Sequence, residues 1–393
     1  MLEGFSSLVG VISNVMYSYL LIIMLLAVGL YFTLRSRFVQ LRLLPESIRV
    51  VGEKTDSNSV SAFQALMVST ASRVGTGNIV GVANAIAIGG YGAVFWMWLI
   101  AIVGGASAFV ESTLAQIYKR KGKDGECYGG PAYYIEAALH CRPLAIIFCI
   151  SMIATYAFGF NMLASYNLQS TFSGFSFYDV KWTPWIIGGI LAVITGWCLL
   201  GGGSRIVKVT STLVPAMGVA YILISVIVMI INRAYLPVVF SKIISEAFDF
   251  KAIFGAFAGS AMMQGIRRGL YSNEAGIGSA PNASASAQVS HPIKQGLVQM
   301  LSVFIDTLLL CTATAMMCLS SGIAPAQELQ GAPWVQAALH KTLGSFGPYF
   351  IMIAMVLFAF TTLLGNCFYC DNLLTYIHKK QPDRKFMTGF RIV

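Results

Sequence analysis

Charge is what this sequence has least of. Asp, Glu, Lys and Arg make up only 11% of the 393 residues, against roughly 25% in an average soluble domain. So few charges cannot cover a globule of this size, and 56% of the residues are hydrophobic. The composition therefore predicts an integral membrane protein that is surrounded by the lipid bilayer. In such a protein the net charge of +10 marks cytoplasmic loops and does not indicate nucleic-acid binding.

Histidine is scarce, and several familiar motifs are missing. The four histidines stand near segment ends or in loops, so the sequence predicts no histidine metal cluster. The eight cysteines fall mostly in apolar runs, which indicates buried thiols rather than disulfides. There is no P-loop, so ATP is not expected as the energy source. Residues 1–13 lack a basic region and a cleavage site, so no signal peptide is expected.

Nine apolar stretches are long enough to cross roughly 30 Å of hydrocarbon. They cover residues 14–34, 62–88, 92–117, 143–170, 183–201, 206–232, 252–272, 297–319 and 347–375. Of the 26 basic residues, 20 lie in the segments 35–56, 119–142, 205–208, 267–294 and 378–391. The positive-inside rule then predicts a multi-pass protein of the cell (plasma) membrane with its N-terminus outside. Segment 36–51 mixes basic and apolar residues and is expected along the inner membrane surface.

Two spans contain several glycines. The second includes the run SRVGTGN at 72–78, and the seventh includes Gly255, Gly259, Gly265 and Gly269. Glycine costs about 1 kcal/mol relative to alanine inside a helix, so we expect both helices to unwind in mid-membrane. Unwound backbone is tolerated there only where it lines a cavity. Its free N–H groups attract a carboxylate and its free carbonyls attract a cation. Close packing of straight helices through small residues is the alternative.

The positions of these two spans indicate a function. If the first span is set aside, the interrupted helices are the first and sixth of the rest, in halves of opposite topology. This pattern is typical of an inverted-repeat transporter with its site at the midplane. An ion channel would need rings of carbonyls or charges along a pore. An intramembrane enzyme would need a nucleophile–base pair or a metal cluster at depth. We therefore expect a transporter and not an enzyme.

Four charged residues lie in or beside the spans: Arg73, Glu111, Glu274 and Asp306. Each needs a partner or a wet cavity, because charge inside a membrane is costly. Asp306 is interpreted either as a cation or proton relay or as a buried carboxylate held by hydroxyls such as that of Thr307, and we favour the second interpretation. Arg73 is interpreted as an inner-side gate or as a helix-stabilising ion pair with Glu111 or Glu274.

Three longer motifs resemble one known family, the sodium:alanine (alanine or glycine:cation) symporters. They are GTGNI at 75–79, GGYGAVFWMW at 89–98 and GLYSNEAGIGSAPN at 269–282. The similarity covers about residues 10–375. It implies an all-α integral membrane protein with an inverted-repeat, leucine-transporter-like helix bundle. It also implies sodium-coupled uptake of a small neutral amino acid, alanine or glycine, by alternating access, with Na⁺ as the co-transported ion.

The resemblance divides residues 1–393, as a single membrane transport domain, into four parts. These are an extra first helix (1–35), a first five-helix repeat (60–232), a second repeat (252–375) and a basic cytoplasmic tail (376–393). After Asp371 only 22 residues remain, and they contain no further apolar span. The second repeat is therefore expected to be incomplete, lacking the last two core helices.

The resemblance also implies where the amino acid and the cation bind. Thr76 and Gly77 would offer backbone N–H groups to the substrate carboxylate. The substrate's amino group and side chain would lie against Phe257, Gly259, Ser260, Met263 and Gln264. A sodium ion would be bound by oxygen atoms, which suit a hard cation: the carbonyls of Ala71 and Val74 and the hydroxyls of Thr361 and Thr362. The side-chain oxygen of Asn78 would lie close to the substrate and serve a cation there.

Two positions depart from the family pattern. Ser165 stands where many members have a glutamine, beside Asn167, which matches a family asparagine; Asn366 replaces a tryptophan. Both changes put a smaller polar group in place of a bulky one. The sequence therefore leaves glutamine or another polar amino acid open as the alternative substrate.

Overall fold

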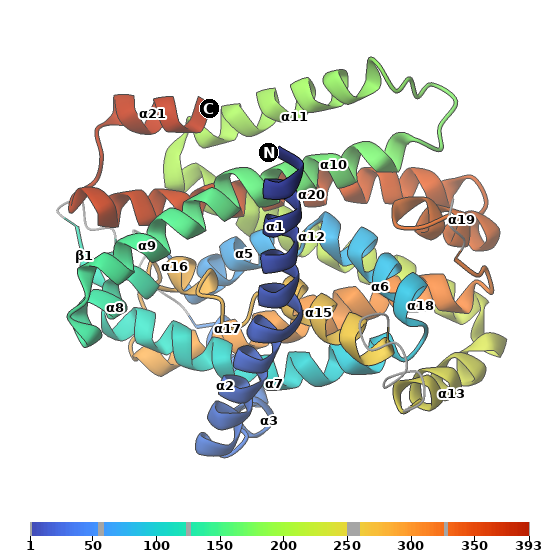
Figure 1. Cartoon of the computed structure of the whole chain (residues 1–393), viewed down its shortest axis with the longest axis horizontal. Coiled ribbons are helices and arrows are strands. Elements are labelled where there is room, and N and C mark those ends of the chain that lie inside the picture. Colours follow the sequence, from blue (N-terminus) through green and yellow to red (C-terminus); the bar gives the residue numbers. More distant parts are fainter. Residues whose placement is uncertain (1, 54–58, 123–126, 250–259, 326–328, 393) are drawn as a thin grey trace.

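The computed structural model describes residues 2–53, 59–122, 127–249, 260–325 and 329–392. These residues are almost entirely helical (Figure 1), and their strands are confined to one short hairpin, β1 (Arg120–Lys121) and β2 (Cys127–Tyr128). Cys367 and Cys370, like the other cysteines, are free thiols. No group of three or more His, Cys, Asp or Glu in these ranges is arranged to hold a metal ion. The helical content and the apolar helices agree with the membrane protein predicted from composition and with the all-α class that the family resemblance implies.

Five helices in the described ranges are long and apolar enough to cross a membrane. Three are uninterrupted along their length and nearly match predicted spans: α7 (Ala93–Ile117), α12 (Gly202–Ile231) and α20 (Phe346–His378). The other two contain a π-helical turn. One runs through α9 (Arg142–Ile153), η3 (Ala154–Phe160) and α10 (Asn161–Phe172), and one through α17 (Pro292–Phe304), η6 (Ile305–Cys311) and α18 (Thr312–Ser320).

Shorter helices fill the space around these five. The N-terminal part consists of α1 (Leu2–Val15), η1 (Met16–Leu20), α2 (Leu21–Arg35), α3 (Val39–Arg42) and α4 (Leu44–Val51). Central elements are α5 (Ala62–Arg73), η2 (Gly77–Gly81), α6 (Val82–Gly89), α15 (Ala261–Asn273) and α16 (Ala280–Ser284). The remaining elements are α8 (Pro131–Leu139), α11 (Thr183–Leu199), η4 (Arg233–Tyr235), α13 (Leu236–Ala247), α19 (Ala332–Leu343) and α21 (Arg384–Ile392). Helices as short as α8, α13 and α19 escape a search for membrane-length runs.

The helix starts follow from local sequence. Proline, which lacks the N–H that a first turn leaves unpaired, stands at the start of α8, α11, α13, α17 and α19. Helix α5 begins with a capping box: Ser61 Oγ accepts from the Gln64 N–H at 3.1 Å, and Gln64 Oε1 accepts from the Ser61 N–H at 2.9 Å. Local signals therefore set where α5, the first half of the interrupted helix, begins.

The central elements lie inside a ring of longer helices. Helix α5 packs on α12 and α20, and α15 packs on α6 and α7. Figure 1 shows α5 and α6 between α20 on one side and α7 on the other, whereas α1 and α2 run across the direction of these helices. The interrupted chain segments are thereby surrounded by protein at the centre of the bundle.

The aromatic motif at 89–98 binds helix α13 through hydrogen bonds and ring contacts. The Tyr91 N–H donates to Glu246 Oε2 at 2.6 Å, and Trp96 Nε1 donates to the Ala247 carbonyl at 2.9 Å. Phe95 and Trp96 also contact the ring of Phe248, directly after α13. This motif therefore attaches α13 to the start of α7.

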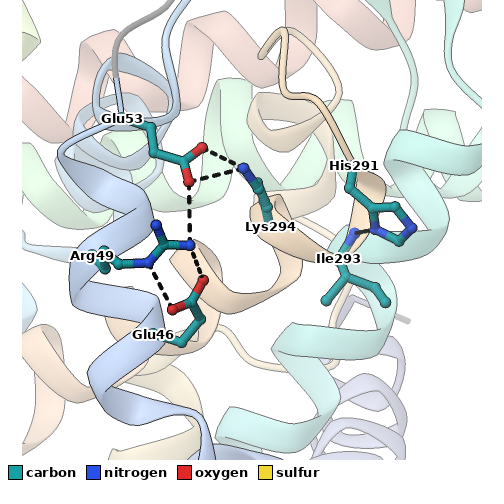
Figure 2. A network of polar contacts seen from close by, with 6 residues as sticks. All are labelled: Glu46, Arg49, Glu53, His291, Ile293 and Lys294. Carbon is teal, nitrogen blue, oxygen red and sulfur yellow. Dashed lines mark hydrogen bonds and ion pairs between the residues drawn. The ribbon is translucent and has the colours of Figure 1, made fainter.

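At the opposite end, α4 is joined to α17 by charged side chains (Figure 2). Lys294 Nζ donates to both carboxylate oxygens of Glu53 at 2.8 and 2.6 Å, and Arg49 pairs with Glu46 and lies 3.7 Å from Glu53. Val50 is fully buried, while Ile48 on the same helix is 60% exposed. Part of the predicted surface segment 36–51 is therefore packed on the bundle, and the exposed part keeps the apolar and basic character expected at a membrane surface.

Helix α20 approaches α5 closely at Gly365. A Cβ on this residue would lie 2.6 Å from the backbone nitrogen of Ser72 and 2.9 Å from its Cα. We expect Gly365→Ala to lower stability by about 1–3 kcal/mol through overpacking, measured as a lower apparent Tm of the detergent-purified protein. Gly188→Ala in α11, where a Cβ would meet no atom within 4 Å, should leave Tm unchanged or raise it. Equal shifts for both variants would contradict this packing.

Candidate functional site

The first predicted interruption is present between α5 and η2. The Gly75 N–H donates to the Arg73 carbonyl at 2.9 Å and to Asn78 Oδ1 at 3.2 Å, not to the carbonyl of Ala71 four residues back. The Asn78 N–H donates to the Gly75 carbonyl at 3.0 Å, not to that of Val74. The carbonyls of Ala71 and Val74 thereby lose the donors that a continuous helix would give them, as a cation site requires.

A second interruption, which the sequence did not predict, lies between α15 and α16. Helix α15 is regular from Ala261 to Asn273, and the chain then turns through Glu274 (φ 50°), Gly276 (φ 84°) and Gly278 (φ 85°) before α16 begins. The left-handed region favours glycine, which explains this location. Phe257 and Gly259, where we expected the break, lie outside the described residues.

The glycines inside α15 have a different purpose. A Cβ on Gly265 would collide with the Ala93 carbonyl, and one on Gly269 with the side chain of Ile100. These two glycines let α15 pack closely on α7, which is the alternative that the sequence left open for glycine-rich spans.

Glu111 of α7 holds the second interruption in place. Its two carboxylate oxygens accept from the N–H groups of Gly276 at 3.2 Å and Gly278 at 3.1 Å. Glu274 accepts from Ser279 Oγ at 2.7 Å. The expected ion pair of Arg73 with either glutamate is not formed, since no described carboxylate lies within 4 Å of its guanidinium. Glu111 instead replaces the helical carbonyls that these N–H groups have lost.

Asp306 of η6 connects the two interruptions. Its side chain accepts from Asn78 Nδ2 at 2.6 Å, from Ser272 Oγ at 2.8 Å and from Thr307 Oγ1 at 3.0 Å. Asp306, Asn78 and Thr307 are fully buried. Two hydroxyls and one amide thus hold the Asp306 carboxylate, which agrees with the favoured interpretation. The cluster gathers several oxygen atoms beside the first interruption.

One cavity opens between the two interruptions. It is lined by residues of four regions: Ser72, Arg73, Gly75, Thr76 and Gly77; Phe160, Leu163, Ala164 and Asn167; Arg268, Tyr271, Ser272 and Glu274; and Thr362. The first interruption thus forms one wall and the end of α15 another. The continuous segment of η3 and α10 and the helix α20 complete the lining.

Four of the predicted site residues line this cavity: Thr76, Gly77, Asn167 and Thr362. Asn167 Nδ2 donates to Thr76 Oγ1 at 3.2 Å. Thr362 Oγ1 is buried, has no hydrogen-bond partner among the described residues and lies where a side chain on Gly75 would stand. A buried hydroxyl without a partner is costly, so this oxygen is free to bind a ligand.

The other described candidates lie away from the lining. Asn78 faces Asp306, and the Thr361 hydroxyl donates to the Leu357 carbonyl at 3.0 Å. Asn366 accepts from Ser72 at 2.7 Å and donates to Asn161 at 2.8 Å, which joins three helices.

Four further candidates lie in or at the start of regular helices. Ser260 caps α15 by accepting from the Met263 N–H at 3.3 Å, and Met263 is buried in an apolar cluster. Gln264 packs against Gly89, and Ser165 is half-buried in α10.

Sequence reasoning missed several lining residues, above all Arg268, Tyr271 and Phe160. Arg268 and Ser272 are four residues apart and therefore share one face of α15, with Tyr271 beside them. The ring of Tyr271 contacts that of Phe160 at 5.3 Å between centroids. The helical spacing of polar residues along 268–272 was the signal that could have indicated this wall.

Interrupted helices that line one cavity are typical of membrane transport proteins of the secondary, ion-driven class. The family model described as "Sodium:alanine symporter family" matches residues 2–393. The chain belongs to the sodium:alanine symporter family, and it is therefore a cation-coupled amino-acid symporter and not an enzyme.

Several relatives are similar over nearly the whole chain. The amino-acid carrier protein AlsT of Bacillus subtilis (strain 168) is 45% identical over 390 residues, which are 99% of this chain and 81% of AlsT. The probable sodium/glutamine symporter GlnT of the same organism is 44% identical over 388 residues, 98% of this chain and 80% of GlnT. The sodium/alanine symporter AgcS of Methanococcus maripaludis is 36% identical over 400 residues, which cover 99% of this chain and 87% of AgcS.

Glu111→Gln should damage the second interruption. An amide has only one acceptor oxygen, so one of the two glycine N–H groups would face an NH₂ group instead. Hydrogen bonds to charged groups contribute about 1.5–3 kcal/mol, and we expect amino-acid uptake in proteoliposomes to fall about tenfold or more. Glu46→Gln, which loses only the exposed pair with Arg49, is the control and should retain wild-type uptake. Unchanged uptake by Glu111→Gln would contradict the assigned role.

Proposed function

We propose that this protein couples the entry of sodium to the uptake of a small neutral amino acid, alanine or glycine, by alternating access. The observation that carries the proposal is the cavity between the two interruptions, where unwound backbone, Thr76, Asn167 and Thr362 meet. Inward movement of one positive charge through 100 mV supplies about 2.3 kcal/mol. This is enough for a concentration ratio of several tens before the sodium gradient is counted.

The substrate carboxylate would bind at the first interruption. The N–H groups of Thr76 and Gly77 stand where a helix restarts, and such groups attract anions. Asn167 would orient the substrate through Thr76, to which it is hydrogen-bonded.

Ser165 and Asn366, the two departures from the family pattern, lie where they favour alanine and glycine over glutamine as substrate. Ser165 and Asn366 do not line the cavity, so their smaller side chains add no space to it. Relatives with alanine and with glutamine in their names resemble this chain, and glutamine stays the alternative to be tested.

Sodium would bind against the carbonyls of Ala71 and Val74 and the free hydroxyl of Thr362, with Thr361 adjacent. The lost helical donors of both carbonyls and the unpartnered Thr362 oxygen support this placement. The side-chain oxygen of Asn78, which accepts from the Gly75 N–H, would serve a cation close to the substrate. Oxygen ligands suit a hard cation such as sodium.

We further propose the cell membrane as location, with the N-terminus outside. Figure 1 shows β1 and α8 near one end of the long helices and α13 and α19 near the other. The basic residues Lys119, Arg120 and Lys121 belong to the first end, and the sparser Lys242 and Lys341 to the second. This division supports a cytoplasmic side at β1 and α8.

Radiolabelled uptake into proteoliposomes tests the proposal. Alanine and glycine should accumulate under an inward sodium gradient, and accumulation should stop when the gradient is collapsed. Thr76→Pro and Asn78→Ala should abolish uptake, because the first removes an N–H group and the second loosens both the interruption and Asp306. Accumulation of glutamine alone would replace the substrate assignment, and uptake that ignores sodium would refute the coupling.

Thr362→Val should affect sodium more than the amino acid. Valine keeps the shape but removes the free hydroxyl, so we expect the sodium concentration for half-maximal uptake to rise about tenfold. The control is Thr375→Val in the same helix, whose hydroxyl donates to the Asp371 carbonyl at 2.9 Å, and it should leave sodium dependence unchanged. An unaltered sodium response in Thr362→Val would show that this oxygen does not bind the ion.

A further inference from the structure

Arg268 brings a positive charge into the cavity without a counter-charge from the described residues. It lines the cavity, and none of the described ion pairs within 4 Å involves its guanidinium. Its Nε is buried and makes no hydrogen bond with any residue in the described ranges. Arg268 is half-buried, and a charge that is partly removed from water without an ion-pair partner is costly, so its side of the cavity is suited to an anionic group that arrives from outside the protein.

The guanidinium lies directly over the first interruption. A Cβ on Gly77 would stand 2.6 Å from an Nη atom of Arg268, and a Cβ on Gly81 would collide with the same guanidinium. The two glycines thus give Arg268 the room to lie against η2. Arg268 and Gly77 are neighbours in the lining of the cavity, so one acceptor group placed there is within reach of both residues.

Tyr271 holds Arg268 in this position. The guanidinium carbon lies 5.0 Å from the centroid of the Tyr271 ring, within the range of a cation–π interaction. Tyr271 itself is fixed against Phe160 of the opposite wall. The planar guanidinium is therefore held between an aromatic ring and a glycine surface, with its Nε buried beside the cavity.

Arg73, the other guanidinium of the lining, differs in its surroundings. It is only 3% exposed, and the buried carboxylates of Glu111, Glu274 and Asp306 lie within its electrostatic range. Its Nη1 also donates to the Gln299 carbonyl at 3.5 Å. Carboxylates of the protein thus offset the charge of Arg73, which leaves Arg268 as the better site for a charge on the ligand.

We propose that Arg268 is a substrate-binding residue that pairs with the carboxylate of the transported amino acid, jointly with the N–H groups of Thr76 and Gly77. The inference rests on the proposed function and deepens it by naming the required chemical class: amino acids with a free carboxylate. Guanidinium binds carboxylate through two parallel N–H···O bonds. Analogues in which the carboxylate is an amide cannot form this pair and are poor ligands.

The test compares alanine with alaninamide in competition with radiolabelled alanine, for binding to the full chain in detergent and for uptake into proteoliposomes. In the wild type, alaninamide should compete at least tenfold more weakly than alanine. In Arg268→Gln the KM for alanine should rise tenfold or more with a smaller change in maximal rate, and the preference for alanine over alaninamide should shrink. Arg268→Lys retains the charge but not the two parallel bonds, so its KM and its preference for alanine should lie between those of the wild type and those of Arg268→Gln.

Arg267→Gln is the matched control, because Arg267 precedes Arg268 but does not line the cavity; its KM and preference should equal those of the wild type. Wild-type KM and preference in monodisperse Arg268→Gln would overturn the inference while the proposed function stands. Should that variant fail to fold, equal competition by alanine and alaninamide in the wild type would overturn it too. A wild type that neither binds nor transports any amino acid would refute the proposed function itself.

Discussion

Hydrocarbon offers no hydrogen bonds, so every backbone N–H and C=O group at membrane depth must find a partner within the protein or its ligands. The rest of this structure depends on how that requirement is met at two places. At the second interruption Glu111 accepts from two glycine N–H groups. At the first, Asn78 satisfies Gly75, and the carbonyls of Ala71 and Val74 lack the helical donors of a continuous helix. The second interruption is thus closed by a protein carboxylate, and the first is the one for which we propose ligands.

The surrounding helices make this arrangement possible by shielding it. Glycines allow α15 to approach α7 and α20 to approach α5, so the interrupted segments are enclosed without bulky side chains between them. The polar groups of the cavity then act at low dielectric, where each interaction with a bound ion or carboxylate is stronger than in water. The glycines that let the helices pack closely therefore also enclose the polar groups of the cavity.

Part of this was predictable from sequence. The all-α membrane class, the main spans and the first interruption follow from composition, apolar length and the GTGN run. The interruption after Asn273 was not predicted, because glycine count alone does not separate packing glycines, such as Gly265 and Gly269, from Gly276 and Gly278, whose φ angles favour glycine. The break expected around Phe257 and Gly259 lies outside the described residues and stays a prediction. Contacts such as Asn78 with Asp306 join residues 228 positions apart and are set by packing, which one sequence does not reveal.

The grip of Asp306 on both Asn78 and Ser272 has a mechanical result. One buried carboxylate accepts from η2 and from α15, so a movement of either segment relative to the other must break or lengthen one of these two hydrogen bonds. The relative motion of the two segments therefore has a cost that is set at Asp306.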